Sequence, residues 1–289
     1  MSDAPGSVRR WVLAARPRTL PAALVPVLVG AALVRPASIN WLNSALCVLV
    51  ALTLQIGTNY ANDYSDGVRG TDEVRVGPFR LTASKLVTPS RVKYAAWLSF
   101  GVAAASGLVL ASLTTWWLVA VGLTAILAGW FYTGGPRPYG YYGFGELFVL
   151  LYFGFVATVG SSYVQHRSIP STSWWFGLAT GAMACALLEA NNLRDVTGDQ
   201  LAGKKTLAAR LGRERASWLY ATCVGAAALA IVVGGEAIVG ALALVLYVPA
   251  LRMAFSPRNG RELLPLLQAS ARTQLALGGL LVATFVVTR

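Results

Sequence analysis

The sequence predicts an all-α protein, a multi-pass membrane bundle of about nine transmembrane helices in one domain spanning residues 1–289. Two observations carry this prediction. Hydrophobic residues make up 56% of the chain and charged residues only 12%, whereas a typical soluble domain is about 25% charged. In addition, apolar runs of the roughly 20 residues that a helix needs to cross a bilayer recur along the whole chain. This composition excludes an ordinary soluble enzyme and leaves no length for a separate soluble domain.

The predicted helices follow the apolar runs in order. They cover residues 17–35, 41–61, 94–112, 115–133, 145–164, 173–192, 215–233, 236–254 and 269–288. Pro21 and Pro26 lie in the first run and predict a kinked helix, because a proline removes a backbone hydrogen bond. Most connectors are short, but two are long and cover residues 62–93 and 193–214. These two connectors contain the charged residues from which a function can be predicted.

The basic residues are divided unevenly between the two sides that these helices define. The chain carries 24 Lys and Arg against 12 Asp and Glu, a formal net charge of +12. With the N-terminus in the cytoplasm, 21 basic residues fall in cytoplasmic segments and three fall outside, namely Arg35, Arg167 and Arg289. Cytoplasmic loops of membrane proteins carry such an excess. We therefore predict an inner, cytoplasmic-membrane protein with both long connectors in the cytoplasm, whose basic charge serves topology and lipid headgroups and not nucleic acid.

The first long connector opens with a cluster of oxygen-bearing side chains. Asp63 and Asp66 are three residues apart, so a helix that continued through them would place both carboxylates on one face. Asn62 adds a neutral oxygen beside them. The glycines that follow would end the helix and let Asp72 fold back toward it.

The second connector carries a matching cluster. Asp195 and Asp199 are four residues apart, again on one helical face, and Asn192 lies one turn before Asp195. Such oxygens are the hard ligands that suit Mg²⁺, which usually takes one or two carboxylates plus substrate phosphates. Two clusters facing each other could hold Mg²⁺ around a diphosphate, with neighbouring Arg and Lys side chains on the remaining phosphate oxygens.

The alternative interpretation is that these acids are ordinary solvated loop residues. Seven of the 12 acidic residues lie in or beside the two connectors, however, and both clusters begin where an apolar run ends. A secondary transporter would instead place its polar residues in mid-span and interrupt corresponding helices. The distribution favours a magnesium-dependent site at the cytoplasmic surface.

The paired motifs resemble those of the UbiA-type intramembrane prenyltransferases. In that family of nine helices, Asn-Asp-x-x-Asp follows the second helix and Asp-x-x-x-Asp follows the sixth. Further stretches resemble the branch whose acceptor is 1,4-dihydroxy-2-naphthoate, namely Arg16–Pro21, Asn62–Gly67, Gly70–Asp72, Tyr132–Pro136, Asn191–Asp195 and Gly203–Leu207. The resemblance implies transfer of a prenyl chain from polyprenyl diphosphate to this acceptor, with loss of CO₂ and pyrophosphate. The product would be demethylmenaquinone, in menaquinone biosynthesis.

Under this resemblance, four groups of residues form the predicted site. The catalytic acids are Asp63, Asp66, Asp195 and Asp199. The Mg²⁺ ligands are the same four acids with Asn62, Asp72 and Asn192. The diphosphate contacts are Arg69, Lys85, Arg137 and Lys205, each of which could equally be a topology charge. The pocket for the aromatic acceptor or the allylic cation contains Arg18, Tyr132, Tyr139 and Glu189.

Two alternatives stay open at this point. A relative with another acceptor, such as 4-hydroxybenzoate, a porphyrin, a chlorin or a phosphoribosyl group, would have similar metal-binding loops. A secondary transporter is the alternative from a different class of protein. The length of the prenyl chain is not predicted, because the depth of a tunnel depends on how the helices pack.

Overall fold

Helices account for nearly all of the chain that the computed structural model describes, which is residues 6–71 and 79–288. The α-helices are α1 (Ser7–Ala14), α2 (Pro21–Ala32), α3 (Trp41–Val68), α4 (Pro89–Leu113), α5 (Trp117–Phe131), α6 (Gly145–Val149), α7 (Gly160–His166), α8 (Ser171–Leu201), α9 (Leu207–Val233), α10 (Ala237–Ala254) and α11 (Leu264–Thr288). A π-helical segment, Leu150–Val159, joins α6 to α7. Every predicted apolar run falls on these helices.

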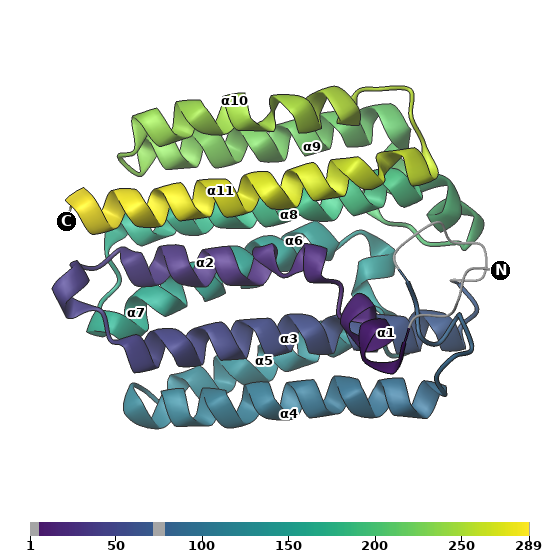
Figure 1. The fold of residues 1–289 in the computed structure, drawn as a ribbon, viewed down its shortest axis with the longest axis horizontal. Coiled ribbons are helices and arrows are strands. Elements are labelled where there is room, and N and C mark those ends of the chain that lie inside the picture. Colours follow the sequence, from purple (N-terminus) through teal and green to yellow (C-terminus); the bar gives the residue numbers. More distant parts are fainter. Residues whose placement is uncertain (1–5, 72–78, 289) are drawn as a thin grey trace.

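The long helices run side by side in one bundle (Figure 1). Helices α8 to α11 form one half of this bundle and α3 to α5 the other half, with α2 and the α6–α7 segment between them. Helix α8 is central, because it packs against α9, α2, α11 and the π-helical segment. Helix α1 lies at one end of the bundle, and α11 ends at the opposite end (Figure 1).

Six of the described helical segments are long and apolar enough to cross a membrane. A seventh span results if α1 and α2, which are bent by 55° at the break before Pro21, count as one. This bend lies just before Pro21, one of the two prolines that predicted a kink, whereas α2 continues through Pro26 as one helix. Helix α5 is apolar but shorter, and α8 carries the charged second motif in its last turns. The structure therefore supports a multi-pass membrane protein, and the total of about nine crossings stays a prediction.

Helices α3 and α8 extend well beyond the predicted C-terminal ends of their apolar runs, and α4, α9 and α11 begin five to eight residues before theirs. Helix α3 continues seven residues beyond the predicted end at 61, to Val68, and α8 continues from 192 to Leu201. Both acidic motifs therefore lie on the last turns of long helices and not in connectors. The predicted ends were wrong because they marked where hydropathy falls, whereas backbone hydrogen bonds continue through polar residues. The positive φ of Gly70, 71°, and of Gly203, 71°, marks the turns that end these helices.

Small residues bring the central helices into close contact. A Cβ added at Gly30 of α2 would lie 2.2 Å from the Thr158 carbonyl oxygen of the π-helical segment. Gly154 in that segment and Gly181 in α8 also approach each other closely, since a Cβ on Gly181 would lie 2.9 Å from the Gly154 Cα. Such contacts between small residues are typical of helices that pack inside a membrane.

Candidate active site

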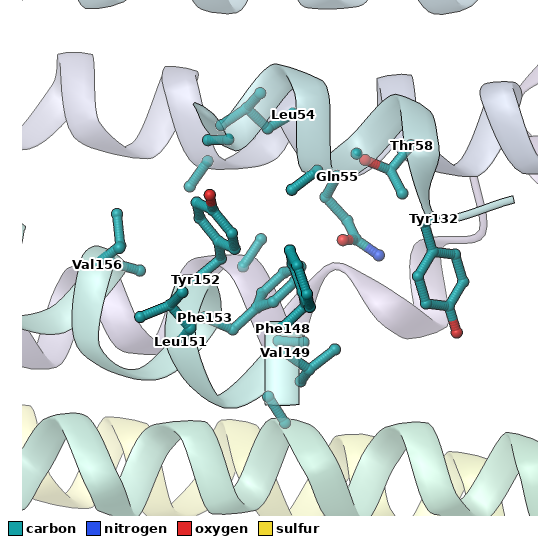
Figure 2. Close-up of a pocket in the computed structure, with 18 of the residues that line it drawn as sticks. Leu54, Gln55, Thr58, Tyr132, Phe148, Val149, Leu151, Tyr152, Phe153 and Val156 are labelled. Atoms are coloured by element: carbon teal, nitrogen blue, oxygen red, sulfur yellow. The ribbon is translucent and has the colours of Figure 1, made fainter. Parts of the chain in front are cut away.

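A cavity of about 790 Å³ runs between the two halves of the bundle. Most of its wall is apolar, and Figure 2 shows Leu54, Gln55 and Thr58 of α3 on one side, facing side chains of the Phe148–Val156 stretch on the other. One part of the wall is polar instead. There it includes Arg16, Asn62, Asp66, Arg80, Asn191, Asn192, Asp199, Lys204 and Thr206. Residues of both acidic motifs therefore meet in one cavity.

The turn after α8 connects the two motifs. The Lys204 backbone N–H donates to the Asp199 carbonyl oxygen at 2.8 Å. This places the Lys204 ammonium group 3.5 Å from Oδ1 of Asp66, and the lysine is 7% exposed. A buried ammonium needs a counter-charge, and Asp66 of the first motif supplies it. The contact fixes the last turn of α8 beside the last turns of α3.

Asp66 is the first-motif acid that faces the cavity. Its carboxylate is 2% exposed and accepts hydrogen bonds from the Tyr141 hydroxyl at 2.5 Å and from Arg80 Nη2 at 3.3 Å. With Lys204, two cations therefore compensate this buried acid. The arrangement holds the carboxylate at the cavity wall without leaving it unpaired.

Tyr141 contacts Asp66 through its hydroxyl and two neighbouring cations through its ring. Burial and the Asp66 carboxylate raise the pKa of its hydroxyl above the ordinary tyrosine value. The group therefore stays protonated at neutral pH and acts as a donor. Lys204 lies 4.6 Å from the centre of the Tyr141 ring and Arg69 lies 5.6 Å from it. Both are within the range of cation–π attraction.

Asp63 points to a different place from Asp66. Its carboxylate is 1% exposed and accepts from the backbone N–H groups of Leu81 at 2.7 Å and Thr82 at 3.0 Å. Asp63 is not one of the described residues that line the cavity. In this conformation it anchors the segment that carries Arg80, and its predicted role as a Mg²⁺ ligand stays a prediction.

The second motif is divided in the same way. Asp195 forms a bidentate pair with the neighbouring Arg194, at 2.7 and 2.6 Å, and both side chains are buried. Asp199 lines the cavity, and Thr206 Oγ1 lies 3.5 Å from its Oδ2. Thr206 also caps α9 by accepting from the Ala209 N–H. Of the predicted acids in the described chain, Asp66 and Asp199 are therefore the two at the cavity wall.

The predicted amide ligands both line the cavity. Asn62 Oδ1 accepts from Thr133 Oγ1 at 2.7 Å, and Asn192 donates to Glu146 and Glu189. The remaining predicted ligand, Asp72, lies outside the described residues.

The predicted diphosphate contacts are all exposed and do not occur among the described residues of the cavity wall. They are Arg69, Lys85, Arg137 and Lys205. Arg69 instead donates to the carbonyl oxygens of Thr133 and Gly135, in the turn that follows α5. Among the described residues, the cations at the wall are Arg16, Arg80 and Lys204, which sequence reasoning did not select. The Gly-Lys-Lys stretch indicated the right turn, but only the fold distinguishes Lys204 from Lys205.

The predicted acceptor pocket is divided as well. Tyr132 and Tyr139 line the cavity, with ring centres 5.5 Å apart, and Tyr139 stacks on Phe148 at 4.0 Å. Arg18 is exposed, and Glu189 is fully buried; in the part of the chain that the structure describes, neither contributes to the wall. The two tyrosines provide aromatic faces next to the polar region.

These side chains fit Mg²⁺ in the manner usual for phosphate-binding sites. The described residues contain no group of three or more His, Cys, Asp or Glu that could enclose a metal ion. Asp66, Asp199 and Asn62 nevertheless present two carboxylates and an amide oxygen to one cavity. Because Mg²⁺ keeps several waters and is commonly held by one or two carboxylates together with substrate phosphates, this donor set is sufficient when a diphosphate is present.

An all-helical bundle with acids and cations in one part of a long apolar cavity defines an intramembrane site for a substrate with a charged head and an apolar tail. Comparison with solved structures agrees on the fold. A UbiA homologue from Archaeoglobus fulgidus, solved bound to DMAPP and Mg²⁺, superposes with a TM-score of 0.65 at 15% sequence identity, covering 95% of this chain and 99% of that chain.

The sequence comparisons establish the family. The model of the UbiA prenyltransferase family matches residues 23–262, and the chain therefore belongs to this family. The 1,4-dihydroxy-2-naphthoate octaprenyltransferase of Mycobacterium tuberculosis is 47% identical over 93% of this chain and 94% of its own length. The protein of the same name from Mycobacterium leprae is 42% identical over 91% of each chain. The predicted family is thus confirmed.

Proposed function

We propose that the protein transfers a polyprenyl chain from polyprenyl diphosphate to 1,4-dihydroxy-2-naphthoate, with loss of CO₂ and pyrophosphate, to give demethylmenaquinone. The observation that carries this proposal is the 47% identity, over 93% of the chain, to a relative named for this acceptor. The cavity agrees with the chemistry of the donor, because it is apolar over most of its wall and charged in one region.

The cavity wall suits both parts of the donor. Arg16, Arg80 and Lys204 bring three cations to the polar region, where a diphosphate would find charge-assisted hydrogen bonds. The prenyl chain would lie along the apolar wall, where each buried CH₂ group contributes about 0.8 kcal/mol. Asp66 and Lys204 are paired to each other in this structure. When the donor binds, Asp66 would contact the metal and Lys204 would contact a phosphate oxygen.

Mg²⁺ would be held by Asp66, Asp199 and Asn62, and it would supply positive charge that stabilises the departing pyrophosphate. Asp63 holds Leu81 and Thr82, and so keeps the neighbouring Arg80 at the wall. Asp195 is held by Arg194 and keeps the last turns of α8 in place.

The aromatic residues of the wall are placed to stabilise an allylic cation. The Tyr139 and Phe148 rings are stacked at 4.0 Å, and Tyr132 packs edge-on against Tyr139. An aromatic face attracts a cation within about 6 Å. The Tyr139 hydroxyl donates to the Ala128 carbonyl oxygen at 2.9 Å, which fixes the orientation of this ring.

The proposed topology follows from the distribution of charge. The chain would cross the cytoplasmic membrane about nine times, with the shorter helix α5 and the charged helix α8 as two crossings in addition to the seven long apolar spans. The polar part of the cavity would face the cytoplasm, because both motif-bearing helix ends lie among the segments with excess basic residues. A lipid-soluble chain and a water-soluble acceptor can meet at that surface.

The test uses purified full-length protein, a labelled polyprenyl diphosphate and a panel of aromatic acids that includes 4-hydroxybenzoate. We expect Mg²⁺-dependent prenylation of 1,4-dihydroxy-2-naphthoate, lost on addition of EDTA and restored by excess Mg²⁺. Asp66→Asn should abolish it, whereas Glu262→Gln, which alters an exposed acid before α11, should not. Turnover with 4-hydroxybenzoate alone would refute the acceptor, and ion flux without prenylation would refute the enzyme class.

A further inference from the structure

Two glutamates from different helices meet behind the cavity wall. Glu146 lies in the first turn of α6, and Glu189 lies on α8 and is fully buried. Asn192 bridges them, because its Nδ2 atom donates to Glu146 Oε1 at 3.1 Å and to Glu189 Oε1 at 3.3 Å. Among the described residues of the cavity wall, Asn192 is present and the two glutamates are not.

Ionisable side chains inside a membrane protein are costly and are usually retained for a function. The site described above uses neither glutamate directly. Both glutamates, however, contact the same amide of a cavity residue, so they can act through Asn192.

The contacts of Asn192 leave it one kind of hydrogen bond to offer the cavity. An asparagine amide has two N–H donors and one oxygen that accepts. Both N–H groups are directed to the glutamates. The Oδ1 oxygen, which can only accept a hydrogen bond, is the atom of this amide that is left for a ligand in the cavity. The glutamates therefore set the amide so that it receives a hydrogen bond or a cation from the cavity.

The position of Asn192 along α8 separates it from the proposed metal ligands. Asn192 and Asp199 are seven residues apart, which corresponds to about 10.5 Å along a helix axis. Two ligand atoms on one Mg²⁺ ion lie at most about 4.2 Å apart, and the bond to Glu189, one turn earlier on α8, holds the Asn192 amide on the side away from Asp199. Leu188 lies one turn before Asn192 on α8, and Leu188 and Tyr132 both line the cavity and both lie next to Gly145, the residue before Glu146.

We propose that Asn192 Oδ1 accepts a hydrogen bond from a hydroxyl group of the aromatic acceptor, and that Glu146 and Glu189 are positioning residues for this amide. This inference rests on the proposed function. In 1,4-dihydroxy-2-naphthoate the 1-hydroxyl lies beside the carboxylate and can donate to it internally. The 4-hydroxyl has no internal partner, so it is the group that needs an acceptor from the protein.

The experiment compares two non-substrate probes, 4-hydroxy-2-naphthoate and 2-naphthoate, by equilibrium dialysis with the full-length protein in lipid nanodiscs at saturating Mg²⁺. The probes differ only in the hydroxyl group. One neutral hydrogen bond corresponds to roughly a fivefold to tenfold preference in Kd. We expect the wild type to prefer the hydroxylated probe by this factor.

The variants test whether Asn192 and the two glutamates cause this preference for the hydroxylated probe. Glu189→Ala and Glu146→Ala should bring the Kd ratio close to one, whereas Glu189→Gln, which keeps an accepting oxygen, should retain it. Asn192→Ser removes the amide oxygen directly while keeping a small polar side chain, and it tests the same preference if an alanine variant does not fold. Thr180→Val is the matched control, because Thr180 is equally buried on α8 and bonds to Thr158 at 2.7 Å, away from the cavity.

Three outcomes would overturn the inference. The first is equal binding of both probes by the wild type, and the second is no binding of either probe. In both cases, prenylation of 1,4-dihydroxy-2-naphthoate by the same preparation shows separately whether the proposed function is correct. The third is an unchanged Kd ratio in Asn192→Ser together with a raised half-saturating Mg²⁺ concentration, which would assign Asn192 to the metal.

Discussion

Replacing Asp63 by alanine should destabilise the protein as well as inactivate it. The side chain is 1% exposed and accepts two backbone hydrogen bonds, from Leu81 at 2.7 Å and Thr82 at 3.0 Å. Hydrogen bonds to charged groups contribute about 1.5–3 kcal/mol each. Losing both leaves two buried N–H groups without this acceptor, which should lower the free energy of unfolding by about 3–5 kcal/mol. At the usual sensitivity of a chain of this size, the apparent Tm should fall by roughly 10 °C.

The assay is thermal unfolding in detergent without Mg²⁺, followed by tryptophan fluorescence, with prenyl transfer measured on the same samples. Asp63→Asn keeps one accepting oxygen and should lose about half as much stability as Asp63→Ala. Activity should fall in both variants, because the released segment carries Arg80, which is 3.3 Å from Asp66. An Asp63→Ala protein with the wild-type Tm and no Mg²⁺-dependent activity would refute the anchoring role and restore Asp63 as a metal ligand.

Two further predictions use matched pairs of substitutions. Lys204→Gln should raise the KM for the prenyl diphosphate by about tenfold or more, since a charged contact is lost. Lys205→Gln, at an exposed position, should change this KM by less than about twofold. Steady-state kinetics with both variants measures the two values, and the reverse ranking would favour Lys205, the residue predicted from the sequence. Gly30→Ala should destabilise the bundle by roughly 1–3 kcal/mol, because its Cβ would lie 2.2 Å from the Thr158 carbonyl oxygen. Gly101→Ala in α4 is the control, because a Cβ there meets open space. Equal Tm values for these two variants would contradict the close packing of α2.

The sequence by itself determined the helices and the two acidic motifs. Apolar runs must be helical in a bilayer, because no water is present to satisfy the backbone. The spacing of Asp63 and Asp66, and of Asp195 and Asp199, predicted a magnesium-dependent site, and the resemblance of these motifs to those of UbiA-type prenyltransferases predicted the family. The extent of the helices was less certain from the sequence, since α3 and α8 continue through polar residues that lie outside the apolar runs.

Only the tertiary structure decided which of several neighbouring residues reaches the cavity. Lys204 and not Lys205, Arg16 and not Arg18, and Asp66 and not Asp63 line its wall in the described chain. The physical reason is that the direction of a side chain at a helix end or turn depends on single backbone angles. Gly203 at φ 71° and Arg16 at φ 55° set two of these turns. Hydropathy and residue spacing do not predict such backbone angles, because contacts between segments far apart in the chain fix them.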